Sequence, residues 1–358
     1  MPDEEVTACT IDIPQAALDD LADRLARTRF SEGPPGEAYG VPVDYVTELV
    51  ERWRTGYDWR EWETRLNALP QFTTAIDGQS VHFLHVRSTN GDALPLILTH
   101  GWPGTVVEYL DVVEPLTRDF HLVIPSIPGF AFSGPATGWN RYRTARAWAE
   151  LMRRLGYDRY GAVGNDVGSS ISLELGRADP DHVIGVHVTQ IFSVPSGDPA
   201  ELEALDEGDS ARLASLRGFM AEKGAYLALQ SSTPQTLAHA LADSPAGLLA
   251  WNAQLFGRAV HPDHVLTHVT IYWLTGTAGS SMRFYREDAD ARRPAEPTGV
   301  PVALAGFADD FFHSIRALAR RDHGRIVSWK EYPGGGHYAA HQAPGTLAAD
   351  IGAFFLSS

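Results

Sequence analysis

The segment Gly164–Gly168, with the sequence GNDVG, constrains this chain more than any other feature. It follows the short apolar run Tyr160–Gly164 and precedes a helix-compatible stretch that we expect to begin at Ser169. Small residues two positions before and after a central residue suit a sharp strand-to-helix turn, because larger side chains there would collide with the neighbouring backbone. Such a turn lifts Asp166 clear of the sheet. We interpret Asp166 as a nucleophile, and a helix-capping role is the alternative.

A carboxylate nucleophile favours one kind of electrophile. Attack by an aspartate on an acyl carbon gives a reactive anhydride, whereas attack on a strained or activated sp3 carbon gives a stable alkyl ester that water can later cleave. Asp166 therefore indicates hydrolysis at an sp3 carbon rather than of an ordinary ester.

Strands and helices are predicted to alternate around this turn. The runs Leu94–Thr99 and Phe120–Pro125 are continuously apolar, as in strands buried on both faces. The stretches 106–116 and 145–155 are suited to crossover helices. This order predicts an α/β fold with a mainly parallel, doubly wound sheet and its chemistry at the carboxyl ends of the strands.

The chain before this sheet has a different pattern. Amphipathic helices are expected over Pro14–Phe30 and Asp44–Trp53, and an apolar face continues through Trp59–Leu69. From Phe72 the period becomes that of strands, and Asp77-Gly78 predicts a hairpin turn. We read this opening stretch as an added module that packs against the rest of the protein.

After residue 194 the sequence shows no strand-like apolar runs for about a hundred residues. The chain then reads mainly as helices separated by Pro234, Pro245 and Pro262, before strands return over 300–304 and 326–332 and a last helix over 344–355. This pattern is typical of a helical lid inserted into the sheet domain. The predicted units are an N-terminal module (1–71), the first part of the core (72–194), the lid (195–295) and the second part of the core (296–358).

Hydrolysis of an ester on Asp166 requires a base for water and an acid that orients the base. His337 is the candidate base, in a glycine-rich loop after the last strand, where its position suggests that it is exposed. The chain order of nucleophile, acid and histidine fits this kind of fold. Asp310 is the preferred orienting acid, and Asp309 is its competitor.

The tetrahedral intermediate of that hydrolysis also needs hydrogen-bond donors for its oxyanion. The backbone N–H of Val167, directly after the nucleophile, is one candidate. The backbone N–H of Trp102, in the loop His100-Gly-Trp-Pro, is the other.

A metal centre is not expected. His341 lies four residues after His337, but no glutamate stands between them in the arrangement of metalloproteases. His261, His264 and His268 form a weak second metal candidate, for which we favour a solvated turn. No cofactor is expected.

The charge and the cysteine content of the chain limit which partners it can bind and which cellular compartment suits it. The 29 basic and 45 acidic residues give a formal net charge of −16, which makes nucleic acid and anionic membranes unsuitable partners. Cys9 is the sole cysteine, so the chain has no internal disulfide and suits a reducing compartment. No secretion signal or spanning segment is seen, which predicts a cytoplasmic protein.

Several motifs together resemble the microsomal-type epoxide hydrolases of the α/β-hydrolase superfamily, from about Ile11 to the C-terminus. They include His100-Gly-Trp-Pro-Gly, the GNDVG turn, Tyr272-Trp-Leu-Thr-Gly and Gly335-Gly-His-Tyr. The resemblance implies the α/β-hydrolase fold with an N-terminal extension and a helical lid. It also implies two lid tyrosines that hydrogen-bond the epoxide oxygen, and the motifs place them at Tyr226 and Tyr285.

The resulting hypothesis is hydrolysis of a small-molecule epoxide by water to a vicinal diol, without a cofactor. The first rival is a haloalkane dehalogenase, which commonly has an indole after the nucleophile, where this chain has Val167. The second is a non-catalytic ligand-binding relative, because fold alone does not establish function. Two roles remain open for the N-terminal module: wrapping the lid or pairing two copies as a homodimer.

Overall fold

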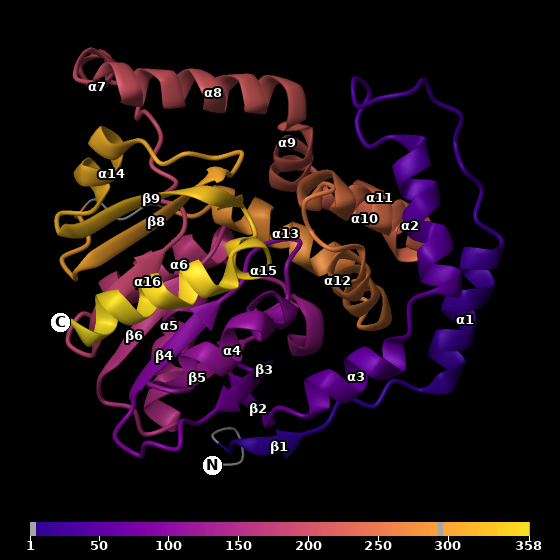
Figure 1. Ribbon diagram of the computed structural model, residues 1–358, viewed down its shortest axis with the longest axis horizontal. Helices are drawn as coiled ribbons and strands as arrows, with labels where there is room; N and C mark the ends of the chain where they lie inside the picture. Colours follow the sequence, from indigo (N-terminus) through magenta and orange to yellow (C-terminus); the bar gives the residue numbers. More distant parts are fainter. Residues whose placement is uncertain (1–4, 293–295, 358) are drawn as a thin grey trace.

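A nine-stranded sheet forms the centre of the computed structural model, which describes residues 5–292 and 296–357 (Figure 1). The sheet has the order β1-β2-β3-β5-β4-β6-β7-β8-β9. The first three pairings are antiparallel, and all pairings from β5 to β9 are parallel. The strands are β1 Thr7–Cys9, β2 Gln71–Ile76, β3 Gln79–Val86, β4 Leu94–Thr99, β5 Phe120–Pro125, β6 Tyr160–Gly164, β7 Val183–Val188, β8 Val302–Asp309 and β9 Ile326–Gly336. The predicted mainly parallel sheet is confirmed.

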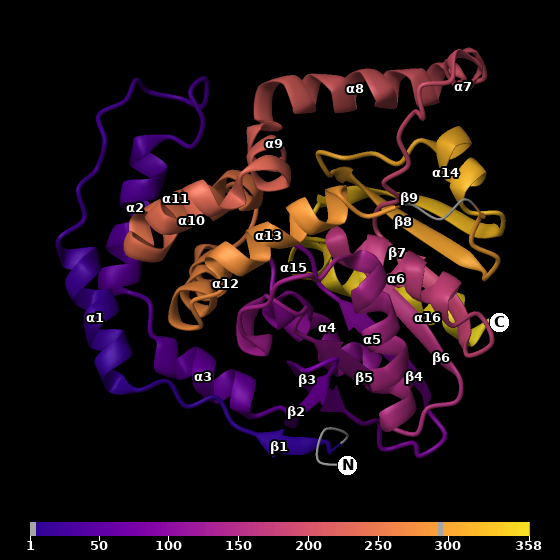
Figure 2. The same ribbon diagram turned by 180° about the vertical axis from the view of Figure 1, so that it is seen from behind.

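Helices cover both faces of this sheet, which explains the continuous apolar runs of its central strands. Helices α4 (Leu110–Leu116) and α16 (Pro344–Leu356) lie on one face, and α5 (Arg141–Arg154) and α6 (Val167–Ala178) lie on the other (Figures 1 and 2). All six residues of β5 are buried as a result.

Two element boundaries differ from the sequence expectation. Helix α6 begins at Val167 rather than at Ser169, because Asp166 makes the whole turn within one residue, at φ 53°. Strand β9 runs on to Gly336 instead of ending at Tyr332. The glycines continue its pairing with β8, with Asp309 opposite Gly336 after an irregularity in the register.

The lid is a series of short helices between β7 and β8, and proline is the first residue of several of them, as is common at that position. The lid helices are α7 Pro199–Glu203, α8 Glu207–Lys223, α9 Ala225–Ser232, α10 Pro234–Asp243, α11 Pro245–Phe256, α12 Pro262–Leu274 and α13 Ala278–Ala289. The predicted end of the lid at residue 295 lies outside the described residues. The division of the chain into four units stays a prediction.

The N-terminal helices α1 (Gln15–Ala26) and α2 (Val43–Thr55) pack against the lid, at the far side of the molecule from β9 (Figure 1). The Tyr45 hydroxyl of α2 donates to the Gly257 carbonyl at 2.6 Å. Arg52 donates two hydrogen bonds to Asp263, at 2.6 and 2.7 Å. Helix α3 (Trp59–Asn67) leads from α2 to the sheet, which the N-terminal strand β1 joins at its edge.

The remaining elements are short. They are the 3-10 turns η2 (Val106–Tyr109) and η3 (Ala131–Ser133), and the helices α14 (Arg316–Asp322) and α15 (Ala339–Gln342). Within residues 5–292 and 296–357, every helix is too short or too polar to cross a lipid bilayer.

Candidate active site

Asp166 occupies the tight turn between β6 and α6. Its backbone has φ 53° and ψ −125°, a conformation that L-residues rarely adopt and that costs free energy. The turn closes only because its flanking positions lack side chains: a Cβ on Gly164 would lie 2.2 Å from the Gly168 carbonyl oxygen, and one on Gly168 would lie 1.8 Å from the Thr99 carbonyl oxygen. The glycines therefore make room for the backbone that presents Asp166.

Gly168→Ala is expected to reduce the free energy of unfolding by about 3 kcal/mol, because the added methyl group must push the backbone of β4 away. Urea denaturation would measure this loss. Gly352→Ala is the matched control, since no other group lies within 4 Å of a Cβ at this position of α16. There we expect a gain of roughly 0.5–1 kcal/mol from the better helix propensity. Equal losses in the two variants would contradict the crowding at the turn.

His337 lies between two carboxylates at the carboxyl ends of the parallel strands. Its Nδ1 is 2.9 Å from Asp310 Oδ1, and its Nε2 is 3.5 Å from Asp166 Oδ2. The expectation that His337 is exposed is wrong: only 4% of the residue is exposed. Strand β9 carries it into the protein, where the Phe311 ring stacks on the imidazole with 4.1 Å between centroids.

The two candidate acids differ in position. Asp309 is the last residue of β8 and is exposed, whereas Asp310 is buried and faces His337. Burial by itself would lower the pKa of the His337 imidazole, but the Asp310 and Asp166 carboxylates outweigh it and hold that pKa well above its usual value. The two neighbouring carboxyl groups therefore favour the protonated form of the His337 imidazole in the free protein.

Gln190 links Asp166 to Asp310, and sequence reasoning missed it. Its Oε1 accepts a hydrogen bond from the Asp166 backbone N–H at 2.8 Å, and its Nε2 donates to Asp310 Oδ2 at 2.6 Å. Gln190 is fully buried, two residues after the end of β7. No local motif marks it, although its position just beyond the carboxyl end of a core strand was a usable signal.

Gln190→Met is expected to lower the free energy of unfolding by about 2 kcal/mol, since it leaves a buried N–H and a carboxylate oxygen without a partner. It should also slow turnover roughly 10-fold, because Asp310 then holds His337 less firmly. Urea denaturation and steady-state kinetics measure the two effects. Gln71→Met is the control, because Gln71 is a buried glutamine of β2 that bonds only to groups outside the site. It should lose stability without losing turnover. Equal turnover in both variants would contradict the role of Gln190.

Two tyrosines of the lid, Tyr226 of α9 and Tyr285 of α13, lie against the Trp102 ring. The Trp102 ring stacks on Tyr226 and meets Tyr285 edge-on, with 5.8 Å between centroids in each case. The two tyrosine rings are 6.4 Å apart. Burial raises the pKa of both phenols, and the Asp166 carboxylate raises each pKa further. The fold therefore brings both lid tyrosines close to Asp166.

The backbone of Trp102 contacts Asp166 directly. Its N–H donates to Asp166 Oδ1 at 2.9 Å. Val167 follows Asp166 as the first residue of α6, where the backbone N–H groups of a helix have no partner within the helix. Of the two predicted oxyanion donors, the Trp102 N–H contacts the Asp166 carboxylate, and the role of the Val167 N–H stays a prediction.

A second buried carboxyl lies beneath the turn. Glu108 is fully buried, and its Oε1 accepts a hydrogen bond from Asn165 Nδ2 at 2.6 Å. Burial raises the pKa of the Glu108 carboxyl to about 7. Sequence reasoning did not single out Glu108, which holds Asn165, the residue before Asp166.

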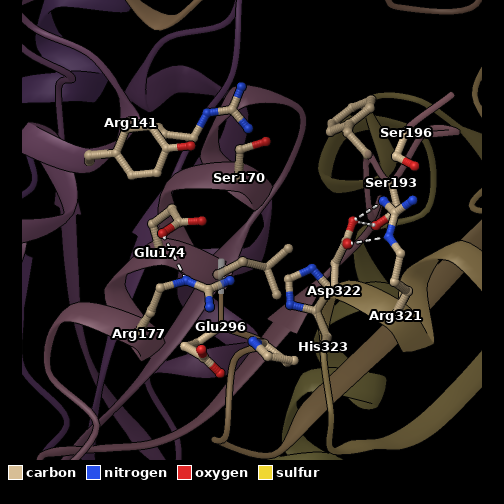
Figure 3. A pocket seen from close by; sticks show the side chains of 14 residues that line it. Arg141, Ser170, Glu174, Arg177, Ser193, Ser196, Glu296, Arg321, Asp322 and His323 are labelled. Atoms are coloured by element: carbon tan, nitrogen blue, oxygen red, sulfur yellow. Dashed lines mark hydrogen bonds and ion pairs between the residues drawn. The ribbon is translucent and has the colours of Figure 1, made fainter. Parts of the chain in front are cut away.

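A cavity of about 340 Å³ lies outside this site (Figure 3). None of the five predicted catalytic side chains lines it. Its basic groups are paired with acids, Arg177 with Glu174 at 3.1 Å and Arg321 with Asp322 at 2.6 Å (Figure 3). The cavity is therefore separate from the site around Asp166 and offers little uncompensated positive charge.

Comparisons with known proteins agree with this geometry. The family described as "Epoxide hydrolase N terminus" matches residues 6–109, and the family described as "alpha/beta hydrolase fold" matches residues 95–342. A Stigmatella aurantiaca protein, provisionally named an epoxide hydrolase, is 38% identical over 97% of this chain and 84% of its own length. "Epoxide hydrolase 1" of Sus scrofa is 30% identical over 98% of this chain and 89% of its own.

A solved structure is similar over nearly the whole chain. The Aspergillus niger epoxide hydrolase is 30% identical, with a TM-score of 0.86, and the match covers 99% of this chain and 96% of that one. The likeness therefore extends through the N-terminal helices and the lid as well as the sheet.

Proposed function

The chain belongs to the epoxide hydrolases of the α/β-hydrolase fold, and we propose that it hydrolyses its epoxide through a covalent ester on Asp166. One observation carries the proposal: Trp102 N–H holds one oxygen of the Asp166 carboxylate, and the other lies 3.5 Å from His337 beneath two tyrosines. A nucleophile, a base and proton donors thus meet in one buried place.

In the first step, Asp166 Oδ2 attacks a ring carbon of the epoxide. The carbon–oxygen bond of the ring breaks, and its electron pair stays on the epoxide oxygen. Tyr226 and Tyr285 hydrogen-bond this oxygen, and one of them gives it a proton. The product is a hydroxyalkyl ester of Asp166, and the phenolate recovers its proton afterwards.

In the second step, His337 takes a proton from water while the water oxygen bonds to the Asp166 carbonyl carbon. The negative charge develops on Oδ1, which already accepts the Trp102 N–H. Collapse of this intermediate breaks the bond between Asp166 Cγ and the ester oxygen, and His337 gives its proton to that departing oxygen. The other proton of the water leaves the Asp166 carboxyl and offsets the one that the phenolate recovers. The vicinal diol leaves with an oxygen that came from Asp166, and the water oxygen remains in the carboxylate.

The raised pKa of His337 explains why the imidazole becomes available as a base only after the ester has formed. The Asp166 charge is one cause of that raised pKa, and formation of the ester removes the charge. The pKa of His337 is therefore lower in the ester than in the free protein, which favours the neutral imidazole that can act as a base.

A single turnover in heavy-oxygen water, with enzyme in excess over epoxide, tests the proposed covalent step. We expect the label in the peptide that contains Asp166 and none in the diol, by mass spectrometry. Label that enters the diol alone would show that water attacks the epoxide directly, and the covalent mechanism would then be wrong.

Ester formation is expected to stay constant up to about pH 10, where an ordinary tyrosine is half ionised. A tyrosine must be protonated to donate to the epoxide oxygen, and the raised pKa of Tyr226 keeps it protonated at higher pH. Rapid-quench mass spectrometry of the His337→Gln variant measures this step without the histidine titration. A fall in rate with a midpoint below pH 10 would contradict proton donation by these tyrosines.

Several features favour an epoxide over a haloalkane substrate. Val167 provides no side-chain N–H for a halide ion, and the Trp102 indole N–H already donates to Ser281 Oγ at 3.2 Å. Two tyrosines suit an oxygen that must be protonated. Water is the second substrate.

Partners and compartment follow from the composition. The net charge of −16 argues against nucleic acid as a partner, and the single cysteine suits a cytoplasmic protein. A homodimer remains a prediction.

A further inference from the structure

Three histidines and an aspartate meet outside the reaction site, where the lid joins the core. Asp111 lies on α4, His264 and His268 lie on α12, and His341 lies on α15. The expected solvated turn is wrong for most of this stretch: the His261 side chain is 63% exposed, but the His264 side chain is 17% exposed and His268 is fully buried. Pro262 begins a helix, which turns His264 and His268 inward.

The nitrogen and oxygen atoms converge at distances that suit a metal ion. One ligand atom each from Asp111, His264 and His341 lies within 4.8 Å of the others. Asp111 Oδ2 is 3.5 Å from His341 Nδ1 and 3.8 Å from His264 Nε2. Bonds of about 2.0–2.1 Å to a tetrahedral zinc ion place neighbouring ligand atoms roughly 3.3–3.5 Å apart. The two separations from Asp111 are close to that requirement and too long for good hydrogen bonds, and the ligand atoms of His264 and His341 lie within 4.8 Å of each other.

His341 has a buried ring nitrogen that lacks a hydrogen-bond partner among the described residues. Its side chain is 2% exposed, and its Nδ1 is buried without a hydrogen-bond partner in the described part of the chain. A buried nitrogen with no partner costs free energy. A bound cation would supply the missing interaction.

Outer contacts orient two of the three ligands, His341 and Asp111, while the His264 ring stacks on His341 with 4.2 Å between centroids. His341 Nε2 lies 3.1 Å from His268 Nε2, and His268 Nδ1 lies 2.9 Å from Thr105 Oγ1. A proton on His341 Nε2 can donate to His268, whose own Nδ1–H donates to Thr105. This arrangement leaves the lone pair of His341 on Nδ1, toward Asp111. Arg65 of α3 donates to the other oxygen of Asp111 at 2.7 Å, as outer partners of ligating carboxylates commonly do.

We propose that Asp111, His264 and His341 bind a divalent transition-metal ion of the zinc class, with water in the remaining position. Two imidazoles favour zinc over calcium or magnesium, which prefer oxygen ligands. The ion would join α12 of the lid to α4 and α15 of the core. Since α15 begins two residues after His337, the ion would also brace the segment that carries the base.

Metal binding to the full chain tests the proposal. After treatment with a chelator and its removal, titration with Zn²⁺ is expected to show one saturable site, and Co²⁺ should give the visible absorption of a low-symmetry nitrogen–oxygen site. Zn²⁺ should raise the thermal midpoint of unfolding, because an ion that binds only the folded state stabilises it. The measurements do not depend on epoxide turnover.

Matched variants assign the site. His264→Ala and Asp111→Asn should each weaken Zn²⁺ binding at least about 100-fold and abolish the rise in midpoint, and His268→Gln should weaken binding about 10-fold. His239→Ala removes an exposed lid histidine outside the group and should bind like the unaltered protein. Circular dichroism checks that each variant folds. Absence of saturable Zn²⁺ binding to the unaltered chain would overturn the proposal without any variant, and so would equal affinity in His264→Ala and His239→Ala.

Discussion

Replacing His337 with glutamine is expected to stop the enzyme at the ester, adding the mass of one substrate to the peptide that contains Asp166. The glutamine amide cannot accept a proton from water, so hydrolysis of the ester should slow by roughly 10⁴-fold. Ring opening by Asp166 needs no base and should continue. Mass spectrometry of the variant after one turnover measures the trapped adduct, and rapid quench measures its decay.

The control for this experiment is His239→Gln, which changes an exposed histidine of the lid. It should release diol as the unaltered enzyme does and show no adduct. A folded His337→Gln protein whose Asp166 peptide keeps its original mass, with epoxide present in excess, would refute the covalent ester.

Replacing both Tyr226 and Tyr285 with phenylalanine is expected to slow ester formation by about 10⁴-fold. Removing one donor to a developing oxyanion typically costs about 10²–10³-fold, and here two donors are lost. Each single variant should slow this step by about 10²-fold. Hydrolysis of ester that has already formed should change little, because neither hydroxyl acts in that step. Rapid-quench measurement of the Asp166 adduct separates the two rates.

Tyr45→Phe is the matched control, because it also removes a tyrosine hydroxyl that contacts the lid but lies outside the site. That hydroxyl donates to Gly257, so its loss should cost about 1 kcal/mol of unfolding free energy and leave ester formation unchanged. If the double variant forms its ester as fast as Tyr45→Phe does, the tyrosines do not assist ring opening.

The parts of the fold that depend on short-range pattern could be predicted. The strands around Asp166 are buried on both faces and read as apolar runs, and the glycines at 164 and 168 are required by close backbone contacts at the turn. The hairpin at Asp77-Gly78 was likewise predictable, since both residues adopt the positive φ that this turn demands.

Features that depend on contacts between distant segments could not be predicted. The burial of His337 results from the stacking of Phe311 and the extension of β9, and neither leaves a local pattern. Gln190 lies 24 residues after Asp166 and 120 before Asp310, and it resembles any glutamine after a strand. Tyr226 and Tyr285 were found through family resemblance alone, because helix packing within the lid decides where they point.

The contact between the N-terminal helices and the lid has a consequence for altering selectivity. Tyr45 and Arg52 hold lid residues that lie more than 200 positions later in the chain. Substitutions in α1 and α2 can therefore shift the lid helices α11 and α12 without changing any residue that contacts Asp166. A mutant library aimed at bulkier or mirror-image substrates gains by including those remote helices alongside the pocket wall.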